Sequence, residues 1–80
     1  MRKQELLHLH QLLYSVRTYL EADAPVPTGA FAEYDAYGVG PNAFDRQKGD
    51  HEAAIRRLLA GIVATIADRR EAESRDRVAV

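Results

Sequence analysis

The chain has 80 residues, which suffices for one domain with a marginal hydrophobic core. It contains no cysteine, which excludes disulfides and thiolate metal sites. Its 11 Lys and Arg residues nearly balance 12 Asp and Glu residues, for a net charge of −1, so a strongly basic nucleic-acid-binding protein is not indicated. Hydrophobic residues at 46% and charged residues at 29% are typical of a folded protein.

The spacing of apolar residues predicts a long helix over residues 2–21. One face repeats at intervals of three and four residues, namely Leu6, Leu9, Leu13, Val16 and Leu20. Pro25 and Pro27 follow this face and forbid continuation of the helix. The first element is therefore an amphipathic helix with a sharp end.

A short helix is predicted over residues 30–37, with Thr28 and Gly29 at its start. Gly38 suits the left-handed residue that ends a helix, and Val39 after it supplies the apolar contact of such a stop. We therefore expect Gly38 to have a positive φ and Val39 to be buried.

The third predicted helix begins within residues 43–50, with Asp45 as its cap, and runs to about Ala72. Residues 1–72 then form one helical domain, and residues 73–80 form a frayed tail. The longest run without charge or histidine, residues 58–67, is about half the ~20 residues that a membrane span needs. We expect a cytoplasmic protein that does not cross a membrane.

Two long amphipathic helices joined by a short one leave apolar surface uncovered, and small domains without disulfides commonly cover it by oligomerising. A row of Ala54, Leu58, Gly61 and Thr65 recurs on the third helix. Gly61 inside a helix costs about 1 kcal/mol relative to alanine, and a close helix–helix contact would offset that cost. The sequence predicts an all-α homodimer that forms a four-helix bundle, with Gly61 at the contact.

His51 lies on the apolar face of the third helix, where a buried imidazole needs a partner for each ring nitrogen. One possibility is a divalent metal such as zinc, with His10, His51 and Glu5 as the candidate ligands. The other is a structural histidine satisfied by a tyrosine hydroxyl or a backbone group. No contiguous metal motif decides between the two possibilities.

Catalytic function is not expected, because Ser15 and Ser74 are the only serines and neither has the setting of a nucleophile. There is also no glycine-rich phosphate loop. Two hypotheses of different classes remain: a small protein that binds a divalent metal, and a homodimeric interaction or regulatory module whose histidines are structural.

Three short segments stand in a distinctive order, namely Glu5-Leu6-Leu7-His8-Leu9-His10, Gly38-Val39-Gly40-Pro41 and Lys48-Gly49-Asp50-His51. In these segments the chain resembles an uncharacterised archaeal family of small helical proteins, over roughly residues 2–66. Haloarchaeal members are often labelled metal-binding proteins, without a defined reaction. The resemblance therefore implies a helical fold and supports Glu5, His10 and His51 as the residues to examine.

Overall fold

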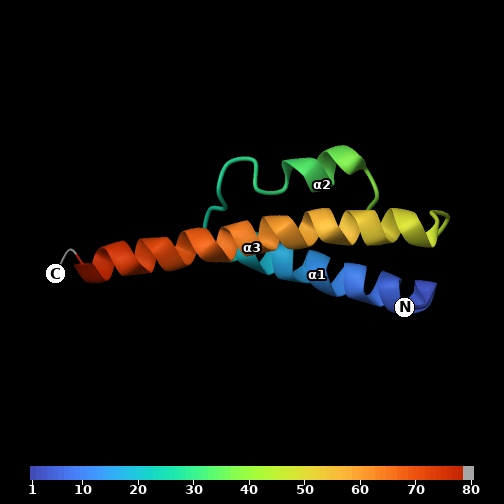
Figure 1. Ribbon diagram of the computed structural model, residues 1–80, viewed down its shortest axis with the longest axis horizontal. Coiled ribbons are helices and arrows are strands. Elements are labelled where there is room, and N and C mark those ends of the chain that lie inside the picture. Colours follow the sequence, from blue (N-terminus) through green and yellow to red (C-terminus); the bar gives the residue numbers. More distant parts are fainter. Residues whose placement is uncertain (79–80) are drawn as a thin grey trace.

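The computed structural model describes residues 1–78, and within them the chain forms three helices and no strand. These are α1 (Lys3–Asp23), α2 (Ala32–Tyr37) and α3 (Lys48–Val78) (Figure 1). The predicted all-α fold of two long helices and a short one between them is confirmed.

The two long helices run in the same direction, because α2 and its flanking loops carry the chain back along α3 before α3 begins (Figure 1). Both α1 and α2 pack against α3. The molecule is elongated, at 52 × 22 × 19 Å, because the C-terminal part of α3 projects beyond the end of α1 (Figure 1). The α1–α3 pair is thus covered by α2 on one side only.

Polar groups fix both ends of α1. At its start, the Glu5 carboxylate accepts a hydrogen bond of 3.0 Å from the Arg2 backbone N–H, which satisfies one of the free amides of a helix N-terminus. At its end, Arg69 from α3 donates through Nη2 to the carbonyl oxygens of Leu20 at 2.6 Å and Ala24 at 3.1 Å. The Leu20 carbonyl also accepts the last helical hydrogen bond, from the Ala24 N–H at 3.2 Å, so Arg69 adds a second donor there and supplies a donor for the Ala24 carbonyl.

The start of α3 differs from the prediction. The helix begins at Lys48, three residues after Asp45, and the capping carboxylate is that of Asp50. Asp50 Oδ2 accepts a hydrogen bond of 3.2 Å from the Gln47 backbone N–H. Asp45 cannot serve as the cap because turns occupy residues 44–46, which keeps it outside the helix.

The end of α2 follows the prediction. Gly38 has a φ of +78° and closes the helix in the left-handed conformation, and Val39 is buried beneath it at 3% exposure. The start of α2 differs from the prediction, because residues 28–31 form turns and the helix begins only at Ala32. Gly29, with a φ of +79°, belongs to these turns, and the Ala32 N–H donates to its carbonyl at 3.1 Å.

The core lies where the segment around α2 packs against α3 and α1. Its buried members are Leu20, Phe31, Tyr34, Val39, Ala54, Leu58 and Ile62. Gly61 is part of this packing, since a Cβ added to it would lie 2.5 Å from Phe31 Cδ1 and 2.6 Å from the Ala30 carbonyl oxygen. The predicted close approach therefore exists, but the prediction of its partner was wrong: Gly61 faces the chain's own residues before α2, and not a second copy.

The C-terminal part of α3 also differs from the expected tail. The helix continues through residues 73–78, and residues 79–80 lie outside the described part of the chain. Ala72 is a strong helix former, and Glu71 and Arg75 have the four-residue spacing that supports a solvated helix. Over the residues described, no helix carries an apolar stretch that could cross a bilayer.

Candidate functional site

His10 of α1 and His51 of α3 meet in the interior of the protein. Their Nδ1 atoms lie 2.9 Å apart, and both side chains have no exposed surface. The parallel arrangement of the two helices brings these residues to the same level, although they are 41 positions apart in sequence. Both histidines singled out in the sequence therefore belong to one site.

Two further groups hold the outer nitrogens of this pair. His10 Nε2 lies 2.7 Å from the hydroxyl of Tyr34 in α2, and His51 Nε2 lies 2.8 Å from the carbonyl oxygen of Ala43 in the loop before α3. The rings meet edge to face, with interplanar angles of 80° for His10 and Tyr34 and 72° for the two histidines. We call these four groups the histidine–tyrosine chain.

When both imidazoles are neutral, the Ala43 carbonyl fixes the direction of every hydrogen bond in the histidine–tyrosine chain. A carbonyl can only accept, so His51 Nε2 carries a proton and donates to it. In neutral His51 the Nδ1 atom is then an acceptor, so His10 Nδ1 must donate to it. His10 Nε2 is left as an acceptor for the Tyr34 hydroxyl. Every ring nitrogen has one partner, as burial requires.

Burial also favours the neutral forms of His10 and Tyr34 near neutral pH. Desolvation, reinforced by the neighbouring His51, lowers the pKa of His10 from 6.5 to about 4. Desolvation, with Tyr14 adding to it, raises the pKa of Tyr34 from 10.0 to about 12. Both shifts favour the neutral form, which is the form that the hydrogen-bond pattern needs.

The guanidinium of Arg17 lies close to the aromatic rings of Phe31 and Tyr34. The Arg17 guanidinium lies 4.4 Å from the centre of the Phe31 ring and 5.7 Å from that of Tyr34. It donates to both carboxylate oxygens of Asp35, at 2.7 and 3.1 Å. These hydrogen bonds raise the pKa of Arg17 above its usual range and lower that of Asp35 below its own. The ion pair thus ties α1 to α2 beside the histidine–tyrosine chain.

Glu5, the third candidate ligand, is not brought to the histidines. It is exposed, and its carboxylate caps the first turn of α1 through Arg2. Among residues 1–75, whose side chains the structure describes, there is no group of three or more His, Cys, Asp or Glu side chains placed to hold a metal ion. The structure therefore joins two of the three candidate residues and places the third elsewhere.

Tyr34 and the Ala43 carbonyl belong to the site; the sequence predicted these two kinds of partner, a tyrosine hydroxyl or a backbone group, but not which residues supply them. The three-residue spacing of Phe31, Tyr34 and Tyr37 indicated packing, which is correct for Phe31 but incomplete for Tyr34. A buried histidine next to a predicted aromatic helix was the available signal for a hydroxyl partner. A backbone carbonyl is present in every residue, so the sequence alone does not show which carbonyl will accept a hydrogen bond.

Taken together, these features define a small three-helix protein with a buried, hydrogen-bonded histidine–tyrosine chain in its core. The protein belongs to the uncharacterised protein family UPF0058, whose model matches residues 1–80. The resemblance to an uncharacterised archaeal family is thus confirmed.

Known proteins of archaea are similar to this chain. A UPF0058 protein of Methanocaldococcus jannaschii is 39% identical over 66 residues, which cover 82% of this chain and 63% of that protein. A UPF0058 protein of Archaeoglobus fulgidus is 37% identical over 62 residues, which cover 78% of this chain and 66% of that protein. The chain thus spans slightly less than two thirds of these relatives.

The fold has also been solved in a relative. The crystal structure of Vng1086c from Halobacterium salinarium superposes with a TM-score of 0.82 at 26% sequence identity, covering 92% of this chain and 99% of that one. The three-helix arrangement is therefore shared with that protein.

Proposed function

We propose that this protein is a non-catalytic interaction module that acts as a homodimer, with histidines that serve its structure. The observation that carries this proposal is an exposed apolar face made by α1 and α3. Its large side chains and their exposed fractions are Leu12 at 62%, Tyr19 at 69%, Leu59 at 45%, Val63 at 58% and Ile66 at 46%.

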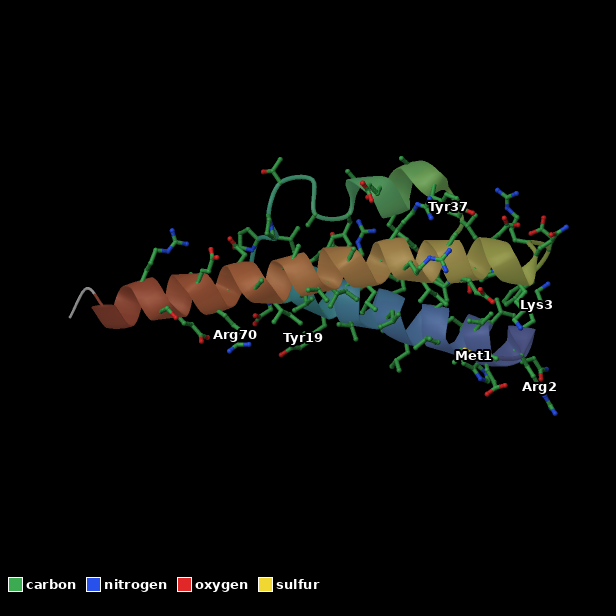
Figure 2. The ribbon with its side chains drawn as sticks, in the orientation of Figure 1. Met1, Arg2, Lys3, Tyr19, Tyr37 and Arg70 are labelled. Carbon is green, nitrogen blue, oxygen red and sulfur yellow. The ribbon has the colours of Figure 1, made fainter. Side chains whose placement is uncertain are left out.

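This apolar face lies on the side of the helix pair that α2 does not cover. On α1, Leu9, Leu12, Val16 and Tyr19 form a row at intervals of three and four residues, next to the buried row that faces α3. In Figure 2, Tyr19 extends away from α2, whereas Tyr37 lies on the α2 side. Two parallel helices that each expose an apolar row present half of a four-helix bundle.

A second copy of the chain fits this face in size. The 21 residues of α1 span about 30 Å, and two packed helices are roughly 20 Å wide, so the face covers on the order of 600 Å² in projection. A standard specific interface buries about 800 Å² per partner. Contiguous apolar patches larger than a few hundred Å² are uncommon on monomers and mark interaction sites.

Two observations support a structural role for the histidines. Each ring nitrogen already has a hydrogen-bond partner, and neither side chain is exposed to a substrate. The histidine–tyrosine chain also joins four parts of the molecule: α1, α2, the loop before α3, and α3. Such a buried polar network favours one arrangement of the helices over others.

Divalent metal binding is the second candidate, and the facing Nδ1 atoms favour it. Their outer nitrogens are held by a carbonyl and a hydroxyl, which resembles the way that outer groups orient metal-bound histidines. We rank it below the structural role because the 2.9 Å separation is that of a hydrogen bond. Calorimetric titration with zinc tests it, and a Kd below about 100 μM would reverse the ranking.

Sedimentation equilibrium tests the homodimer. The wild type should dimerise at micromolar concentration, and Val63→Glu should raise the dimer Kd at least ~100-fold, or about 2.7 kcal/mol, because it places a charge in the apolar face. Ala64→Glu is the matched control, since its neighbouring position on α3 is exposed outside that face. A wild type that stays monomeric at about 100 μM would rule out the proposal.

A further inference from the structure

We draw no further inference here: the strongest candidate, the surface hollow of about 220 Å³ between Tyr14 on α1 and the α2 residues Tyr34 and Asp35, carries none, because the Arg17 guanidinium already pairs with that carboxylate and lies beside both tyrosine rings, and nothing in the structure shows what would fill it.

Discussion

Replacing Gly61 by alanine should destabilise the protein, although the same change usually stabilises a helix. An added methyl group would lie 2.6 Å from the Ala30 carbonyl oxygen and 2.5 Å from Phe31 Cδ1, whereas comfortable contacts are ~3.5–4.0 Å. The backbone oxygen cannot turn aside, and Phe31 is only 4% exposed, so its ring has little room. Overpacking of this kind costs about 1–3 kcal/mol, and the gain in helix propensity returns about 1 kcal/mol. We expect a net loss of up to about 2 kcal/mol in the free energy of unfolding.

Urea denaturation at one fixed protein concentration measures this loss, because dimerisation makes stability depend on concentration. In a domain of this size each kcal/mol also lowers Tm by roughly 4–8 °C. Gly49→Ala is the matched control: it lies in the same helix with no atom within 4 Å of the added group, and it should leave stability unchanged or raise it. If Gly61→Ala is as stable as Gly49→Ala, the close packing of α3 against the segment before α2 is refuted.

Three further predictions concern the histidine–tyrosine chain and the helix stop. Tyr34→Phe should cost about 1–3 kcal/mol, measured by urea denaturation, because it leaves the buried Nε2 of His10 unpaired; an unchanged midpoint would contradict the hydrogen bond. The unfolded chain takes up a proton on His10 near its ordinary pKa of 6.5, whereas the folded protein resists until about 4, so stability should be full above pH 6.5 and fall as the pH drops toward 4. Denaturation midpoints measured across this pH range give the slope of stability against pH. This slope should be smaller in His10→Gln than in the wild type, and equal slopes in the two proteins would exclude His10 as the cause. Gly38→Ala should cost about 1 kcal/mol in thermal denaturation, since its φ of +78° strains a residue with a Cβ, and no loss would show that the turn relaxes.

Periodicity predicted the helices and half of the site. The apolar spacing of α1 and α3 is strong because each helix buries one face, and Gly38 with Val39 forms a local signal that needs no tertiary information. The same periodicity placed His51 on the apolar face of its helix. The meeting of His10 and His51 depends on the parallel direction of the two helices, which apolar spacing alone does not determine.

The predictions that failed depend on long-range packing. Gly61 correctly indicated a close approach, but spacing cannot tell whether the approaching segment belongs to the same chain or to another. Glu5 lies at a helix start, where capping its own backbone is an alternative to binding a metal, and the local contact is the one observed. Asp45 was the predicted cap for α3, but the chain turns before Lys48 and leaves it outside the helix, and Asp50 makes the capping contact instead.

Nitrogen-15 NMR of the histidine rings tests the structural role of His10 and His51 most directly. At pH 7–8 the bonding pattern requires a proton on Nδ1 of His10 and on Nε2 of His51, and zinc should leave both rings unchanged. The exposed His8 provides a solvent-accessible reference in the same spectrum. A His10 ring without a proton on Nδ1, or zinc-dependent shifts at the Nδ1 atoms of both buried rings, would show that the pair binds a metal and contradict the structural role.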